Sequence, residues 1–269
     1  MTALGKLYGV GVGPGAPDLL TLRAVRVLES ADVLALPRSS DFGASMAYRI
    51  LEPVLGKPRE PRKQERLLLT FPMSKDPDRV RPHVDAAIDK IGERLSRGLS
   101  VAFATEGDPS LFSTFVYVRR EALRRFPGLE VEVVPGVTSV TAVPAVSGLS
   151  LADGQERIAI LPATYGVDDL TEVLQRFDTV VLMKIGSEMP KVTEALTRAG
   201  LLDRAVFVSK ATMPEQRIVR DLRAAQGERG DCFAMVVVTR GERSGLLVGE
   251  AEASPPGAFG KTLDEPEAP

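Results

Sequence analysis

Short apolar runs alternate with helix-like segments from Lys6 to Ser147. The runs have β-strand composition, and the segments between them repeat apolar residues with the 3.6-residue period of a helix. Because parallel strands must be joined by crossovers, this alternation predicts an α/β domain with a mostly parallel sheet. Strands are expected at Lys6–Gly13, Asp32–Pro37, Arg66–Thr70, Ser100–Ala104 and Val131–Val134, and helices after Asp18, at Ser45–Leu55, Asp78–Arg97 and Val116–Arg125, and from Thr138 or Ser139.

A second set of elements follows Ser147–Gly154, where the composition changes and where we expect a linker. Two late strands follow one another without a clear helix between them, so this half is expected to mix parallel and antiparallel pairing. The sequence thus predicts domains at 1–147 and 148–250, with a disordered tail at 251–269 that is rich in proline and acids. Strands are expected at Arg157–Leu161, Thr179–Met183, Ala205–Val208, Gln216–Leu222 and Phe233–Thr239, and helices at Asp168–Phe177 and Met189–Ala199.

The loop Thr105–Thr114 is the first candidate site. It lies between a buried strand and a helix, where open α/β sheets bind ligands at the carboxyl ends of their strands. Gly107 permits close approach of the backbone to a ligand, and Pro109 fixes one φ angle. A βα loop that only caps its helix explains the same polar residues, so the loop alone leaves both interpretations open.

A glycine-rich loop follows the first strand. Gly11-x-Gly13-x-x-Ala16 matches the dinucleotide-binding pattern, and Arg38 after the second strand suits a 2′-phosphate, so an NADP-dependent oxidoreductase is one alternative. Pro14 argues against it, because proline removes an N–H that should face the pyrophosphate. A tight strand-to-helix turn without a ligand is a further alternative.

Composition excludes several classes of protein. The net charge of −2 gives no overall attraction to nucleic acid or to acidic membranes. One cysteine, Cys232, and one histidine, His83, cannot form a Cys/His zinc cluster, so we expect no protein metal site. No apolar run is long enough to span a bilayer, and the first residues lack a signal-peptide pattern, so we expect a cytoplasmic protein.

Several motifs occur together and in order. They are Tyr8–Gly15, Glu106–Pro109, Val134–Ser139, Val180–Lys184 and Ala211–Gln216. This series resembles the tetrapyrrole (corrin/porphyrin) methylases, which transfer a methyl group from S-adenosylmethionine. The resemblance extends over roughly residues 5 to 245 and implies two αβα domains with the cofactor in a cleft between them, usually in a homodimer.

Within that family the chain most resembles the members that methylate C20 of precorrin-2 in cobalamin (vitamin B12) synthesis. This narrower likeness rests on Leu36–Ser39 with Ser45–Ala47, on Phe71–Met73, on Pro109–Phe115 and on Gly148–Gly154 followed by Ile160–Ala163. The alternatives are methylation of the cobalt-loaded form (cobalt-precorrin-2 or cobalt-factor II) or of another precorrin. A regulatory nucleotide-binding module without catalysis is a more distant alternative with no positive feature.

The resemblance also implies site residues. Ala16 and Phe112 stand where aspartate and tyrosine are frequent in the family, and Ala211 stands where some members have glycine. No residue is assigned as the base that removes the C20 proton. The implied cofactor-binding residues are Pro14, Glu106, Gly107, Asp108, Leu111, Thr138, Ser139, Met183 and Ala211.

A tetrapyrrole substrate carries several carboxylates, and a near-neutral protein needs local cations to bind them. Arg38, Lys184 and Lys210 each follow a predicted strand, so we expect them to bind the substrate. For each of these side chains, a solvated surface charge is the alternative.

Overall fold

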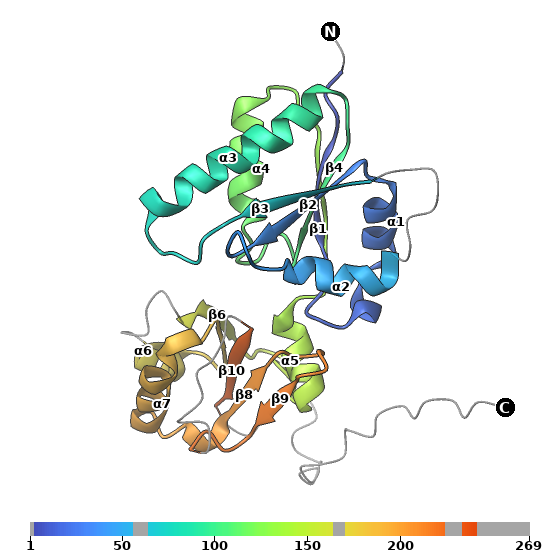
Figure 1. Cartoon of the computed structure of the whole chain (residues 1–269). Helices are drawn as coiled ribbons and strands as arrows, with labels where there is room; N and C mark the ends of the chain where they lie inside the picture. Colours follow the sequence, from blue (N-terminus) through green and yellow to red (C-terminus); the bar gives the residue numbers. More distant parts are fainter. Residues whose placement is uncertain (1–2, 56–63, 164–169, 224–232, 241–269) are drawn as a thin grey trace, which may run out of the picture. The chain divides into compact units, whose positions relative to one another are not determined.

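The structure, a computed structural model, describes residues 3–55, 64–163, 170–223 and 233–240 (Figure 1). The chain divides into two compact units, Met1–Ser139 and Val140–Pro269, so the helix that begins at Ser139 is grouped with the second unit. The expected tail at 251–269, Cys232 and the first residues of the expected helix Asp168–Phe177 lie outside the described residues.

The first unit contains a five-stranded sheet in the order β3-β2-β4-β1-β5, and all of its pairs are parallel. Each crossover carries a helix, as the alternation of the sequence predicted. The strands are β1 (Leu7–Gly11), β2 (Val33–Arg38), β3 (Glu65–Thr70), β4 (Val101–Thr105) and β5 (Val131–Val134); the helices are α1 (Leu22–Ser30), α2 (Met46–Leu55), α3 (Pro77–Ser96) and α4 (Phe115–Arg125).

Two apolar layers cover the faces of this sheet. Phe103 on β4 packs with Ile88 and Ile91 of α3 and with Val118 of α4. On the other face, residues such as Leu34 pack with α1 and α2. Figure 1 shows the same arrangement, with α3 and α4 on one face and α1 and α2 on the other. Parallel strands that are covered on both faces need continuous apolar runs, and β4 is buried throughout.

Helix α1 begins at Leu22, a few residues after Asp18. A short 3-10 turn, Pro17–Leu19, comes first, and Asp18 lies within it. The Thr21 side chain then accepts a hydrogen bond from the Ala24 amide at 3.1 Å, so Thr21 caps the helix.

The second unit contains a mixed five-stranded sheet in the order β6-β7-β10-β8-β9. β6 and β7 are parallel, whereas β10 is antiparallel to β7 and β8, and β9 is antiparallel to β8. The mixture of pairings predicted for this half is confirmed. The elements are α5 (Ser139–Ser147), β6 (Ile158–Pro162), α6 (Leu170–Arg176), β7 (Thr179–Met183), a 3-10 turn (Gly186–Glu188), α7 (Met189–Arg198), a second turn (Leu202–Arg204), β8 (Ala205–Ser209), β9 (Arg217–Val219) and β10 (Ala234–Thr239).

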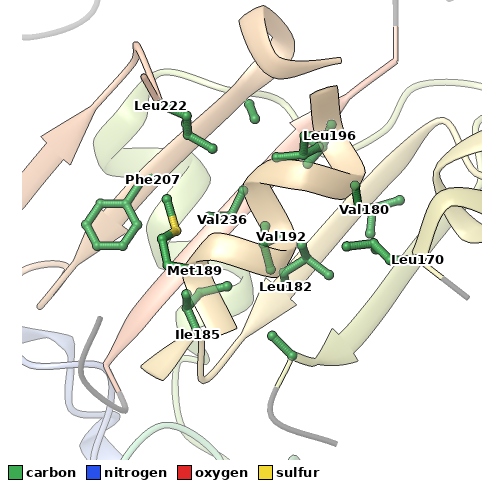
Figure 2. Packing of buried hydrophobic residues seen from close by; sticks show 14 of the residues in the cluster. Leu170, Val180, Leu182, Ile185, Met189, Val192, Leu196, Phe207, Leu222 and Val236 are labelled. Carbon is green, nitrogen blue, oxygen red and sulfur yellow. The ribbon is translucent and has the colours of Figure 1, made fainter. Parts of the chain in front are cut away.

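This unit has an apolar core of its own. Figure 2 shows Val192 and Leu196 of α7 in one cluster with Leu182 and Val236 of the sheet and with Leu170 of α6. These side chains are almost completely buried. The two units therefore bury separate sets of apolar residues.

Ion pairs on and between helices α3 and α4 should make the stability of the first unit depend on pH. Glu121 accepts hydrogen bonds from Arg124 and Arg125, which lower its pKa to about 2, and Arg125 also binds Asp89 at 2.6 Å. Only 18% of the Glu121 side chain is exposed. In the unfolded chain a glutamate has a pKa of about 4.3, so the pairing stabilises the folded form above that pH and is lost as the pH falls toward 2.

Glu121→Gln should therefore lower the free energy of unfolding by about 1 kcal/mol at pH 7, the upper end for exposed ion pairs. The difference from the wild type should vanish as the pH falls from about 4.5 to about 2. Urea unfolding curves at a series of pH values would measure it. The control Glu172→Gln breaks an exposed pair with Arg176 on α6 and should change stability at pH 7 by only a few tenths of a kcal/mol. A constant difference between wild type and Glu121→Gln over this range would contradict the prediction.

Candidate functional site

Three loops leave the carboxyl edge of the first sheet from neighbouring strands. β4, β1 and β5 are adjacent, with Gly11 opposite Thr105 and Val10 opposite Val134. The loops that follow them begin at Val12, Glu106 and Pro135. Because the strands are parallel and in register, all three loops start at the same edge, which is where open α/β sheets bind ligands.

The first two loops are joined by a pair of backbone hydrogen bonds. The Gly107 amide donates to the Gly13 carbonyl at 2.8 Å, and the Gly13 amide donates to the Gly107 carbonyl at 3.3 Å. Both residues have positive φ angles, +80° and +64°, which side chains disfavour. This bridge fixes the loop that carries Pro14 against the loop that carries Glu106 and Asp108.

The third loop packs against the same bridge. A Cβ atom on Gly136 would lie 2.2 Å from the Gly107 carbonyl oxygen and 2.8 Å from the Cα of Gly11. A Cβ atom on Gly11 would lie 2.6 Å from the Gly136 nitrogen. All of these neighbours are backbone atoms, so only glycine permits the three loops to meet. Gly136 is thus a part of the site that the sequence-based residue set missed, although its position directly after a strand-ending proline was a usable signal.

Asp108 connects the second and third loops through its carboxylate. Oδ1 accepts a hydrogen bond from the Ser110 amide at 2.8 Å, and Oδ2 accepts one from the Gly136 amide at 3.1 Å. A carboxylate that accepts two N–H bonds holds both loops at once. The structure therefore gives Asp108 a local role in shaping the loops.

A buried hydroxyl pair starts the helix after the second loop. Thr105 and Ser113, at 4% and 7% exposure, lie 2.9 Å apart through their hydroxyl oxygens. Ser113 also accepts from the amide of Phe115, the first residue of α4. Phe112 between them has a φ of +50° and is 40% exposed. Leu111 is half-buried in the same loop.

Pro14 is buried, and Thr138 and Ser139 are half-buried at the start of α5. The structure thus brings Pro14, Glu106, Gly107, Asp108 and Leu111 to one edge of the first sheet. Thr138 follows the third loop at that edge.

Four further expected residues, Met183, Lys184, Lys210 and Ala211, lie at one edge of the second sheet. β7 and β8 run in the same direction because both are antiparallel to β10, so Lys184 and Lys210 follow strand ends at the same edge. Both lysines have positive φ angles, +55° and +50°. The amides of Ile185 and Lys210 donate to the carbonyls of Ala234 and Phe233, each at 3.2 Å, which holds both turns against the start of β10.

A left-handed conformation costs a residue with a side chain about 1 kcal/mol, and such strain concentrates at functional sites. Met183 and Ala211 flank these two lysines and are 8% and 5% exposed. Arg38 belongs to the first unit, at the end of β2, where it contacts Thr70 and Asp41.

Within the described ranges, no group of three or more His, Cys, Asp or Glu side chains is placed to hold a metal ion. None of the helices that the structure describes is long and apolar enough to cross a membrane.

Comparison with known proteins identifies close relatives. The Salmonella typhimurium cobalt-precorrin-2 C(20)-methyltransferase is 35% identical, over 84% of this chain and 92% of the relative. The precorrin-2 C(20)-methyltransferase of a Sinorhizobium species is 31% identical, over 87% of this chain and 95% of the relative. The cobalamin biosynthesis protein CobIJ of Mycobacterium tuberculosis is 35% identical over 93% of this chain, which spans about half (49%) of that longer protein.

Solved structures share the fold. The cobalt precorrin-4 methyltransferase CbiF superposes with a TM-score of 0.67 at 26% identity, over 87% of this chain and 94% of CbiF. The uroporphyrin-III C-methyl transferase of Thermus thermophilus, solved as a complex with S-adenosylhomocysteine, gives 0.63 at 26% identity, over 87% and 97%. These likenesses confirm the α/β fold class expected from the sequence.

The family model of the Tetrapyrrole (Corrin/Porphyrin) Methylases matches residues 6–225, which is most of the chain and includes the three loops that follow β1, β4 and β5. The loops that meet at Gly13, Gly107 and Gly136 thus lie within the matched region. This chain belongs to the tetrapyrrole (corrin/porphyrin) methylase family.

Proposed function

We propose that this protein is an S-adenosylmethionine-dependent C-methyltransferase that methylates C20 of precorrin-2 in cobalamin biosynthesis. The observation that carries the proposal is the likeness to two C(20)-methyltransferases along nearly the whole length of each. One of these relatives is named for precorrin-2 and the other for its cobalt form, so the cobalt-loaded substrate is the principal alternative.

S-adenosylmethionine is the proposed cofactor, and a related structure holds its product S-adenosylhomocysteine. The loops of the first unit suit such a ligand, because an added Cβ at Gly107 would meet nothing within 4 Å, so a ligand can approach the bare backbone there. We assign cofactor binding to the residues that the family motifs imply: Pro14, Glu106, Gly107, Asp108, Leu111, Thr138, Ser139, Met183 and Ala211. Arg38, Lys184 and Lys210 are proposed to bind the substrate carboxylates.

The reaction needs positioning more than it needs a protein nucleophile. The cofactor supplies a methyl group that is already activated by its sulfonium. The chain must hold the nucleophilic carbon and the methyl group in line, about 3 to 3.5 Å apart, and exclude water. Loops fixed to one another by backbone bonds and by Asp108 suit that task, because they keep the geometry without reorganisation.

The alternative of an NADP-dependent oxidoreductase loses support from the loop geometry. The Gly13 amide donates to Gly107, and Pro14 has no amide proton, so neither donates to a pyrophosphate. Helix α1 begins only at Leu22, after an intervening 3-10 turn. A dinucleotide-binding loop needs a helix N-terminus directly at its end.

Calorimetric titration with S-adenosylhomocysteine, with NADP as the parallel ligand, tests the cofactor. We expect micromolar binding of the first and none of the second. Methyl transfer to precorrin-2 and to cobalt-precorrin-2, followed by mass spectrometry of the product, then tests the substrate. Binding of NADP alone would overturn the proposal, and methylation at a carbon other than C20 would replace it with another precorrin methylase.

A homodimer and a cytoplasmic location complete the proposal. The homodimer is what the resemblance to the family implies, and the cytoplasmic location is the expectation drawn from the sequence itself. Analytical ultracentrifugation at micromolar concentration and fractionation of the source cells would check them.

Asp108→Ala gives a prediction for the cofactor site. The change removes the acceptor for the amides of Ser110 and Gly136 and frees the third loop. Hydrogen bonds to a charged group are worth about 1.5–3 kcal/mol, so the dissociation constant for S-adenosylhomocysteine should rise at least about tenfold while the protein stays folded. Calorimetry measures the constant, and circular dichroism checks the fold.

Asp32→Ala is the matched control. Its carboxylate accepts from the Ser100 amide at 2.9 Å and joins two loops at the opposite, amino edge of the same sheet. This variant should lose stability but keep its affinity for S-adenosylhomocysteine. Equal affinity in the Asp108 and Asp32 variants would remove Asp108 from the site.

A further inference from the structure

A polar cluster joins the carboxyl ends of β2 and β3. Arg38 and Thr70 are register partners and the last residues of these strands. The Arg38 Nε donates to the Thr70 hydroxyl at 3.1 Å, and that hydroxyl donates to Asp41 Oδ1 at 2.6 Å. The Arg38 Nη2 also donates to Asp41 Oδ1, at 3.2 Å. Thr70 thus relays a hydrogen bond between the arginine and the carboxylate.

These contacts fix the plane of the Arg38 guanidinium. Two of its three nitrogens are held on one side by Thr70 and Asp41, and within the described residues Nη1 has no hydrogen-bond partner. A planar fork that is already oriented loses less entropy when it binds a carboxylate in bidentate fashion. Arg38 is 18% exposed and Asp41 71%, so the arginine lies mostly within the protein while its partner faces solvent.

Asp41 stays ionised, which the arrangement requires. The hydrogen bond from Thr70 lowers the pKa of Asp41, and the charges of Arg38 and of His83 on α3 act in the same direction. An ionised Asp41 keeps the Thr70 hydroxyl pointing its proton away from Arg38, and so leaves the Thr70 oxygen as the acceptor for Nε.

We propose that Thr70 and Asp41 are positioning residues, which hold Arg38 so that it can bind a carboxylate of the substrate. This inference rests on the proposed function and adds two residues to it that no family motif implied.

The loops that follow β2 and β3 each carry an exposed apolar side chain. Phe42, next to Asp41, is fully exposed, and Met73, after β3, is 71% exposed. A cation between loops that carry exposed apolar groups suits an amphipathic ligand, and a conjugated macrocycle with carboxylate arms has that chemistry. The tetrapyrrole is therefore the occupant to which the proposal commits.

An ordinary surface ion pair is the competing explanation. Such pairs contribute little, and removal of one partner has no effect on a distant ligand. The two explanations differ in whether the effect of replacing Thr70 depends on the presence of Arg38. If Thr70 acts through Arg38, its replacement has no further effect once Arg38 is absent.

The test is a mutational cycle with steady-state kinetics of methyl transfer to precorrin-2. Arg38→Ala should raise the KM for the macrocycle about tenfold, the effect of one charge-assisted contact. Thr70→Val should raise it about fivefold through loss of the hydroxyl that orients Arg38, with kcat nearly unchanged. Thr70→Ser keeps the hydroxyl and should restore the wild-type KM. Asp41→Asn should raise KM in the same direction as Thr70→Val.

In the Arg38→Ala background, Thr70→Val should change KM no further. Thr197→Val removes a hydroxyl bonded to the Thr193 carbonyl on α7, and Asp203→Asn breaks an exposed pair with Arg223; both are controls that should keep the wild-type KM. Affinity for S-adenosylhomocysteine, measured for every variant, shows that the first unit is folded.

Each result decides the question. A wild-type KM in Thr70→Val, or an equal rise in KM with and without Arg38, would overturn the inference while the proposed function stands. Wild-type protein that binds S-adenosylhomocysteine but methylates neither macrocycle would instead defeat the proposed substrate, and the inference with it.

Discussion

Replacement of Gly136 with alanine is expected to disrupt the three-loop junction. The new Cβ atom would lie 2.2 Å from the Gly107 carbonyl oxygen and within 2.8 Å of Gly11, and neither neighbour is a side chain that can move aside. The loops must separate, which breaks the bond from the Gly136 amide to Asp108. We expect a loss of about 3 kcal/mol of stability in the first unit. The dissociation constant for S-adenosylhomocysteine should rise about hundredfold, the factor that corresponds to such a cost.

Gly128→Ala is the matched control for this variant. Gly128 lies in the same unit, between α4 and β5, and has a φ of +85°, but an added Cβ would meet nothing within 4 Å. Its only penalty is the left-handed backbone, about 1 kcal/mol, and cofactor affinity should not change. Thermal unfolding and calorimetry measure both quantities. Wild-type affinity in a folded Gly136→Ala variant would show that the junction is not needed for the cofactor.

Local pattern predicted the elements of the first unit well. The expected helix Asp78–Arg97 differs from α3 (Pro77–Ser96) by one residue at each end, because Asp76 caps the helix and Pro77 occupies its first turn. Parallel strands that are buried on both faces must be continuous apolar runs, so their positions are also readable in one sequence.

The order of the strands in the sheet could not be predicted from local pattern, because it depends on contacts between distant residues. The chain pairs β10 between β7 and β8, which are consecutive strands in the sequence. No local pattern encodes that insertion. The expected strand Gln216–Leu222 is also shorter in the structure, where β9 covers only Arg217–Val219, because it pairs with β8 through those residues alone.

The candidate site also has one part that the sequence predicts and one part that it does not. A parallel sheet brings the loops after its strands to one edge, so the glycine and proline motifs were enough to predict that these loops lie together there. The contacts between the loops could not be predicted, because they depend on register. The hydrogen bond that the Gly136 amide donates to Asp108 and the cluster of Arg38, Thr70 and Asp41 both join residues from different strand ends. The positive φ angles of Lys184 and Lys210 could not be predicted from the sequence, because lysine does not favour the left-handed conformation.

Truncation of Phe103 should have the largest effect on stability. The ring is completely buried on β4, with the Phe71 and Phe115 rings at 6.1 Å and 5.6 Å between centroids. Phe103→Ala removes those contacts and leaves a cavity, at a cost of about 4 kcal/mol. Phe115 packs so closely on Gly9 of β1 that a Cβ there would lie 2.1 Å from its ring, so little collapse can fill the space.

Because the two units have separate cores, the loss of stability in Phe103→Ala should be confined to the first unit. Amides of β1 and β4 should exchange with solvent faster in Phe103→Ala, while those of β7 and β10 keep the wild-type rate, because hydrogen exchange reports local free energy. Phe207→Ala, which empties a site in the core of the second unit, is the matched variant and should give the reverse pattern. Hydrogen exchange followed by mass spectrometry measures both. Equal acceleration in both sheets would mean that the units unfold as one, so that damage at either core reaches the loops proposed to bind the cofactor.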